Sequence, residues 1–192
     1  MANAMAHEAH HDDHAHDHHG PGPWTRIFTT TNHKDIGSMY LWFGFIMFFV
    51  GGAMALLLRA ELFQPGLQIV QPEVFNSLTT VHALVMIFGG VMPAFVGFAN
   101  WLIPMQIGAA DMAFPRMNNW SFWIMIPASI LLMASFFVPG GAAASGWTLY
   151  PPLVTQGGIG TDMTILAIHL LGASSIMGSI NIITTILNMR AP

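Results

Sequence analysis

Cysteine is absent from the 192 residues, and charged residues make up only 7% of them. Without cysteine the chain can form neither a disulfide nor a thiolate metal site, which leaves histidine, carboxylate and backbone oxygen as metal ligands. Soluble domains carry about 25% charged residues, so the low charge and the 54% hydrophobic content indicate a membrane protein. The net charge of −4 lies largely in the first 19 residues and gives no indication of nucleic-acid binding.

The first 20 residues hold seven of the ten histidines, interleaved with acidic residues. A tract of this composition cannot build a hydrophobic core. We therefore expect residues 1–30 to form a disordered, histidine-rich tail and residues 31–192 to form a membrane domain. Histidine-rich tracts can also chelate zinc, copper or nickel, and this alternative stays open.

Four apolar runs are long enough to cross a hydrocarbon core of about 30 Å as helices. They cover residues 36–58, a stretch within 75–105, residues 121–138 and residues 163–189. Pro93 lies inside the second run, where a neighbouring helix can satisfy the carbonyl that proline leaves free. Small residues such as Gly51 and Gly52 allow close helix packing in lipid. The sequence thus predicts an all-α polytopic transmembrane bundle.

The basic residues predict the orientation of these spans. Arg59 alone lies on one side, and the opposite side holds Arg26, Lys34, Arg116 and Arg190. Because cytoplasmic loops are enriched in lysine and arginine, we expect both termini to be cytoplasmic. His82 then lies about two turns below the outer surface, and Asp111 lies at the inner end of the same helical pair.

His82, in TTVHALVMIFGG, stands in a run without a charged residue from Val74 to Ala110. Ionisable residues inside a membrane are usually functional. Three interpretations are open: a hydrogen bond to a neighbouring helix, a proton or ion pathway, or axial ligation of a haem iron. His169, in ILAIHLLG, lies near the outer end of the fourth run, and we expect it to be a structural histidine.

Six segments occur in an order that favours one family. They are TNHKDIG, LLLRAELFQPG, TVHALVMIF, IGAADMAFPRMNNWSFW, GWTLYPPL and HLLGASSIMGSINIITTILNMRAP. Together they resemble subunit I of the haem–copper terminal oxidases, in particular the cytochrome c oxidases of bacteria and mitochondria. The resemblance runs from about Thr31 to the last residue.

The resemblance implies a haem site on the outer side. It makes His82 one axial ligand of the low-spin haem, which would be haem a. Filled axial positions favour electron transfer over oxygen binding. Arg59 matches an arginine that contacts the haem formyl group, and Trp147 matches a tryptophan near the haem propionates. Without the resemblance, both would be ordinary interfacial residues.

The segment RAELFQPG resembles the outer-face cation site of the family. In this comparison Glu61, Gln64 and Gly66 supply oxygen ligands, which suit Ca²⁺ or Na⁺. Part of that site comes from a distant segment that this chain lacks.

The resemblance also implies a proton pathway that starts at Asp111, the mouth of the D pathway of the family. Protons cross a low-dielectric interior only along hydrogen-bonded groups and water. The matching polar residues are Asn118, Asn100, Asn181, Ser174 and Ser175, with Tyr40 close by. Without the resemblance, Asp111 would be a loop charge, and the Asn118–Asn119 pair would be a helix cap before the third span.

Quinol oxidases of the same superfamily carry four polar residues around their substrate. Aligned on Arg59 and His82, these positions hold Val50, Met54, Val74 and Ser77. The four expected side chains are missing, so we expect cytochrome c to be the electron donor.

The family continues beyond four spans, through the second haem ligand, the high-spin haem and the copper B ligands. We therefore expect the N-terminal portion of an oxidase subunit I from a bacterial plasma membrane, as a fragment or a piece of a split subunit. Its partners would be the rest of subunit I, subunits II and III, cytochrome c and membrane lipid. The alternatives are a stand-alone four-helix haem protein that relays electrons, a quinol-oxidising relative, and a metal-cation transporter.

Overall fold

The computed structural model describes residues 22–191, and every regular element in that range is a helix. In chain order the elements are α1 (Pro23–Thr29), α2 (His33–Glu61), α3 (Pro72–Leu84), the π-helical segment η1 (Val85–Val91), α4 (Met92–Ile107), α5 (Pro115–Ala134), the 3-10 segments η2 (Ser135–Phe137) and η3 (Val154–Gln156), and α6 (Ile159–Asn188).

Within residues 22–191, four helical stretches are long and apolar enough to cross a membrane: His33–Glu61, Pro72–Ile107, Pro115–Phe137 and Ile159–Asn188. The prediction of an all-α membrane bundle with four spans is therefore confirmed. The third stretch begins at Pro115 rather than at residue 121, because the first turn of a helix does not need the N–H that proline lacks. The cytoplasmic position of the termini stays a prediction.

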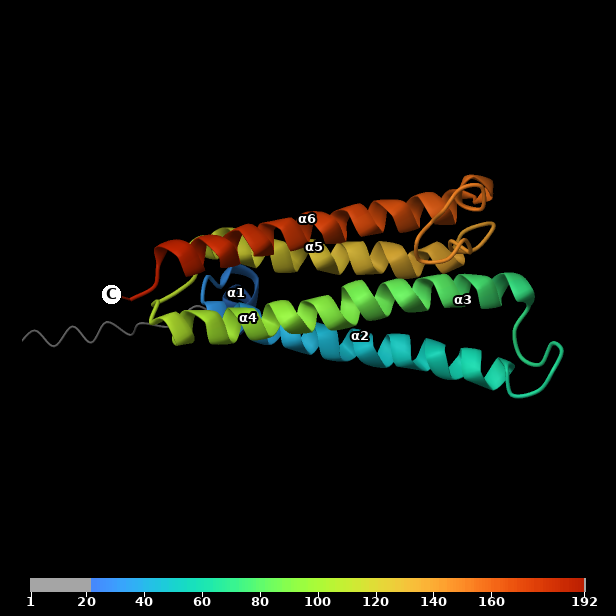
Figure 1. Ribbon diagram of the computed structural model, residues 1–192, viewed down its shortest axis with the longest axis horizontal. Coiled ribbons are helices and arrows are strands. Elements are labelled where there is room, and N and C mark those ends of the chain that lie inside the picture. The colour runs from blue at the N-terminus through green and yellow to red at the C-terminus, as the bar shows by residue number, and fades with distance from the viewer. Residues whose placement is uncertain (1–21, 192) are drawn as a thin grey trace, which may run out of the picture.

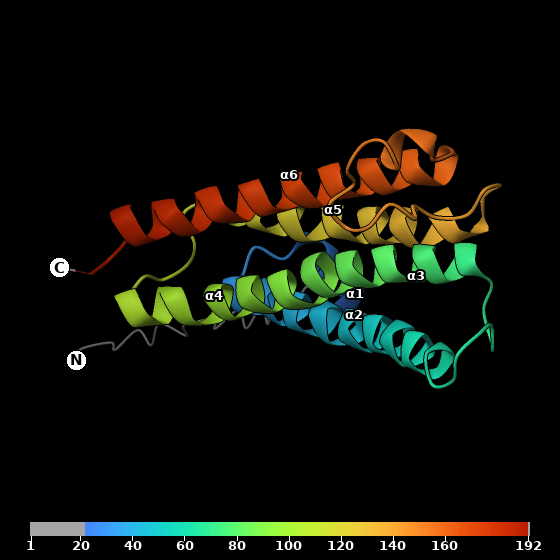
Figure 2. The same ribbon diagram turned by 45° about the vertical axis from the view of Figure 1, so that its right-hand side comes forward.

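The four spans form two antiparallel pairs that lie side by side (Figures 1 and 2). In one pair α2 packs along α3, η1 and α4, and in the other α5 packs along α6. Contacts of α4 with α6 and of α2 with α5 join the pairs. The Ala191 N–H donates to the carbonyl of Ile107 at 2.8 Å, so α6 ends beside the end of α4. We call this the termini end, and we call the end with the 62–71 and 138–158 connections the opposite end.

The helix α1 lies within the predicted tail and was not expected. Its Phe28 ring stacks on Trp123 of α5 with the centroids 4.6 Å apart, and the Phe28 carbonyl accepts from Asn119 Nδ2 at 3.0 Å. Arg26 forms an ion pair with Asp35 at 2.9 Å, and this carboxylate raises the pKa of the Arg26 guanidinium. These contacts fold residues 22–30 back onto the bundle. Residues 1–21, with the histidine-rich tract, lie outside the described residues.

The second span changes its winding before Pro93. In η1 the turns are wider, and the Met92 N–H donates to the carbonyl of Ile87, five residues back. Such segments are a known way to accommodate proline inside a membrane helix. The span therefore stays continuous from Pro72 to Ile107.

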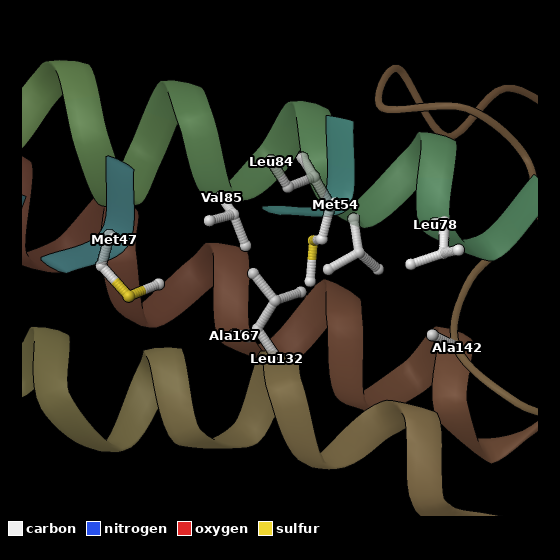
Figure 3. Packing of buried hydrophobic residues seen from close by; sticks show 9 residues of the cluster. Met47, Met54, Leu78, Leu84, Val85, Leu132, Ala142 and Ala167 are labelled. Atoms are coloured by element: carbon white, nitrogen blue, oxygen red, sulfur yellow. The ribbon is translucent and has the colours of Figure 1, made fainter. Parts of the chain in front are cut away.

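Two apolar clusters fill the bundle along its length. The cluster toward the opposite end is shown in Figure 3 and joins α2, α3, η1, α5 and α6 around Met54, Val81 and Leu132. The cluster toward the termini end surrounds Ile36 and Phe122. Buried polar side chains that interrupt this apolar packing are therefore the candidates for a functional site.

Candidate functional site

His82 lies near the end of α3 and is half-buried. Its Nδ1 is 2.9 Å from the carbonyl oxygen of Gly51 on α2. Because a carbonyl can only accept, Nδ1 carries the proton in this hydrogen bond. In the neutral imidazole Nε2 then keeps its lone pair. This is the arrangement of a metal-ligating histidine, whose second nitrogen usually donates to a carbonyl or carboxylate.

Gly51 permits the close contact between α2 and the second span. A Cβ atom at this position would lie 2.9 Å from Cγ of Met86 and 3.3 Å from Cγ1 of Val85. At the next residue, Gly52, nothing lies within 4 Å of such an atom. The two neighbouring glycines therefore differ, and only Gly51 is required by the packing that brings its carbonyl to His82.

The other predicted haem contacts lie toward the same end of the bundle. Arg59 is exposed and follows Gly51 by eight residues, or about 12 Å along the helix. Trp147 is 51% exposed, and the N–H of the preceding Gly146 donates to Thr80 Oγ1 at 3.0 Å. Because Thr80 is two residues from His82, this bond ties the loop of Trp147 to the histidine's helix.

His169 is exposed on α6, and its Nδ1 donates to the carbonyl of Ile165 one turn earlier at 2.8 Å. This local bond agrees with the expectation of a structural histidine. No bond joins it to another helix within residues 22–191.

Glu61 is buried at the end of α2, and it holds the following loop. Its carboxylate accepts the backbone N–H groups of Gln68, Ile69 and Val70 at 2.9, 2.6 and 3.0 Å. Gln64 and Gly66 are exposed and line the same hollow of about 510 Å³ as Glu61. The hollow gathers hard oxygen donors, but three of about four acceptor sites on the carboxylate are already used. The Ca²⁺ or Na⁺ site therefore stays a prediction.

A second group of polar residues lies toward the termini end and joins three helices. The side-chain amide of Asn118 on α5 donates to Oδ1 of Asn100 on α4, and both residues are buried. The carbonyl of Asn100 accepts from Nδ1 of the buried His33 on α2 at 2.7 Å. Because α5 begins at Pro115, Asn118 and Asn119 lie inside the helix, and the alternative of a helix cap is wrong.

Hydroxyl groups continue this arrangement along the bundle. Ser121 Oγ donates to the carbonyl of Asn118 at 2.6 Å, so the Tyr40 hydroxyl, 2.7 Å away, donates to Ser121. Ser174 of α6 donates to the backbone carbonyl of Ser121. Tyr40, Ser174 and Ser175 line a cavity of about 20 Å³, which has room for roughly one water.

Asp111 is half-buried in the connection between α4 and α5, and its Oδ1 accepts from the Met112 N–H at 2.7 Å. Two residues of α6 hold this connection. Asn181 Oδ1 accepts from the Phe114 N–H at 2.8 Å, and Thr185 Oγ1 accepts from the Ala113 N–H at 2.9 Å. The structure thus brings the predicted Asp111 and Asn181 to the same end as Asn100 and Asn118.

Two buried atoms of this group have no hydrogen-bond partner, Asn118 Oδ1 and Asn181 Nδ2. A buried polar atom without a partner is costly, and in native proteins an internal water usually satisfies it. One acceptor and one donor are therefore available to internal water among the residues predicted to hold a water chain.

Sequence reasoning missed three members of the group, Ser121, His33 and Thr185. All three are buried and bond to residues that were predicted, namely Tyr40, Asn100 and Asn181 respectively. His33 stands in the TNHKDIG segment and Ser121 in MNNWSFW, so both were within reach of the resemblance. The sequence gives no indication of a role for Thr185, except that it follows Asn181 by four residues on α6.

Comparison with known proteins gives a consistent result. Residues 35–192 match the family described as Cytochrome C and Quinol oxidase polypeptide I. The chain is 49% identical over 169 residues to cytochrome c oxidase subunit 1 of Corynebacterium efficiens, which covers 86% of this chain and 29% of that protein. It is 50% identical over 169 residues to the subunit 1 of Synechocystis sp., with 87% and 30% covered. A probable subunit 1-alpha of Streptomyces avermitilis is 48% identical over 167 residues, with 85% and 29% covered.

The chain spans about three tenths of the length of the curated relatives it matches. The matched region takes in the four spans except the first two residues of α2, and it includes His82, His169 and the polar group at the termini end apart from His33. On this evidence the chain belongs to the family of polypeptide I of the cytochrome c and quinol oxidases.

Proposed function

We propose that the chain is the N-terminal portion of subunit I of a cytochrome c oxidase in a bacterial plasma membrane. In the complete enzyme it would contribute one axial ligand of the low-spin haem and the start of a proton route. The enzyme would reduce oxygen with electrons from cytochrome c and translocate protons, together with the rest of subunit I and subunits II and III. The observation that carries the proposal is the hydrogen bond from His82 Nδ1 to Gly51.

That bond supports the haem assignment because it fixes the ring and leaves Nε2 for the iron. A bound haem a would supply reversible one-electron transfer at this site. His82 would hold the iron, and the cationic side chain of Arg59 would stabilise electron density on the macrocycle. The Trp147 loop, tied to α3 through Gly146, would lie beside the polar edge of the group.

The polar group at the termini end supports the proton route. Asp111 would collect protons at the surface, and Asn100, Asn118 and Asn181 would position water beyond it. The unpartnered Asn118 Oδ1 and Asn181 Nδ2 favour this interpretation, since both are buried and free to bind water. The cavity at Tyr40, Ser174 and Ser175 would hold a further water.

The donor is proposed from the four positions that bind quinol in related enzymes. Met54 is buried and apolar, and Val74 is exposed and apolar. The Ser77 hydroxyl already donates to the carbonyl of Ala142 at 2.9 Å. A hydroquinone would find no free polar partner there, which favours cytochrome c.

A stand-alone haem protein would need a second histidine that faces His82. His169 is the other histidine on the spans beyond α2, and it is exposed and bonded to its own helix. This disfavours the alternative.

The test is the haem spectrum of the purified oxidase that contains this chain. His82→Ala should remove the low-spin haem absorbance, because it removes the Nε2 atom that is proposed to bind the iron. His169→Ala should leave the spectrum unchanged. Loss of the low-spin signal in His169→Ala, or its retention in His82→Ala, would contradict the assignment.

A further inference from the structure

A groove of about 380 Å³ lies on the outer surface of the bundle, toward the termini end. It is lined by Ser38, Leu41, Trp42, Phe45 and Trp101. Four of these five side chains are apolar or aromatic, and Trp42 and Phe45 are 66% and 55% exposed. The groove belongs to neither the His82 site nor the polar group inside the bundle.

One wall of the groove, the Trp101 indole, is held in place by hydrogen bonds. Trp101 Nε1 of α4 donates to Ser38 Oγ of α2 at 3.1 Å, and Ser38 Oγ donates to the carbonyl of Lys34 at 2.8 Å. The indole ring therefore cannot rotate freely. It forms a fixed wall between the two helices.

A cation stands at one end of this apolar surface. Lys34, Ser38, Leu41 and Phe45 follow one stripe of α2, since they are three or four residues apart. The Lys34 ammonium lies 5.6 Å from the centre of the Trp101 ring. Lys34 is the stripe's member nearest the start of the helix, where the span leaves the hydrocarbon core.

Lys34 is not neutralised by a nearby carboxylate of the described chain. Across residues 22–191 the ion pair found is the one between Arg26 and Asp35, which occupies the adjacent carboxylate. The Asp111 carboxylate is engaged by the Met112 N–H. The end of the groove therefore carries an available positive charge.

We propose that this groove binds an anionic phospholipid. One acyl chain would lie along Leu41, Trp42, Phe45 and Trp101, and the phosphate would meet Lys34. An apolar groove that ends in a cation at the membrane surface complements such a lipid in both shape and charge. The proposal does not depend on the assignment of His82 or of the proton route.

The test is native mass spectrometry of the purified oxidase containing the full chain, delipidated and titrated with phosphatidylglycerol or phosphatidylcholine. We expect phosphatidylglycerol to bind more tightly. Lys34→Gln should weaken its binding about fivefold and leave phosphatidylcholine unchanged, and Lys34→Arg should restore it. Arg190→Gln, which removes an exposed cation at the same end, is the matched control and should have no effect.

The apolar half of the site is tested separately. Trp42→Ala should weaken the binding of both lipids. Phe49→Ala, which changes a comparably exposed aromatic residue of α2 outside the groove, should not. Equal binding of the two lipids, unaffected by Lys34→Gln, would overturn the proposal. A photocrosslinker at residue 42 that labels another polypeptide rather than lipid would overturn it as well.

Discussion

The two halves of the bundle use polar groups in different ways. Toward the termini end, side chains of different helices bond to one another, as in Asn118–Asn100, Tyr40–Ser121 and Trp101–Ser38. Toward the opposite end, side chains bond to backbone carbonyls instead. Thr164 and Ser135 donate to carbonyls one turn earlier, and His82 and Ser77 donate to carbonyls of other segments. A polar group in a membrane span must find a partner within the protein. Hydrogen bonds between side chains of different helices are therefore characteristic of the half with the proposed proton route. The half with the proposed haem ligand is packed mainly by apolar side chains.

The largest expected effect tests the apolar half. Gly51→Val should place new carbon against Met86 and Val85, push α2 away from η1 and break the bond to His82. Overpacking of this kind costs about 3 kcal/mol, and the low-spin haem absorbance of the oxidase should be lost. Gly52→Ala, where nothing lies within 4 Å, should retain the spectrum. A normal spectrum in Gly51→Val would show that this close contact is not needed.

A smaller effect is expected in the polar half. Asn118→Leu should leave Asn100 Oδ1 buried without a donor, which costs about 2 kcal/mol. Proton uptake should slow while the haem spectrum stays normal. Thermal unfolding and stopped-flow proton uptake measure the two effects. Asn118→Asp keeps an oxygen that can still bind water. Comparing it with Asn118→Leu therefore distinguishes the effect of lost hydration from the effect of lost packing.

The loop at the opposite end should respond locally. In Glu61→Gln the single amide oxygen cannot accept all three N–H groups, so residues 68–70 should exchange their amide hydrogens about tenfold faster. Hydrogen exchange with mass spectrometry measures this. The exchange of the α4–α5 connection, held by Asn181 and Thr185, should not change. Unaltered exchange at 68–70 would mean that the carboxylate does not hold the loop.

The smallest effect is expected at α1. Arg26 and Asp35 form an exposed pair, and such pairs contribute little because water and salt screen them. Asp35→Asn should leave the unfolding midpoint unchanged in 0.5 M salt, about the strength at which screening is severe. Phe28→Ala, which removes the stacking on Trp123, should have the larger effect on this segment.

The four spans could be predicted from the sequence because each is an apolar run long enough to cross a membrane. Their bounds differ from the prediction by a few residues. The partner of His82 could not, since it is a backbone carbonyl 31 residues away whose position depends on how α2 packs. The roles of Ser121 and His33 likewise arise from contacts between helices. The helix α1 is too short and too weakly periodic to stand out, and its contacts with α5 and α2 stabilise it.

The wide turns of η1 have a consequence for the register of the second span. Each α-helical residue advances the face of a helix by 100°, and a π segment absorbs about one extra residue. The stretch Val85–Val91 thus sets the phase between His82, which meets α2, and Asn100, which meets α5. Deleting one residue from it would restore regular α-helical winding and leave Asn100 facing Asn118. Deleting one residue from α4 before Asn100 would instead rotate Asn100 by about 100° away from Asn118, with His82 left in place.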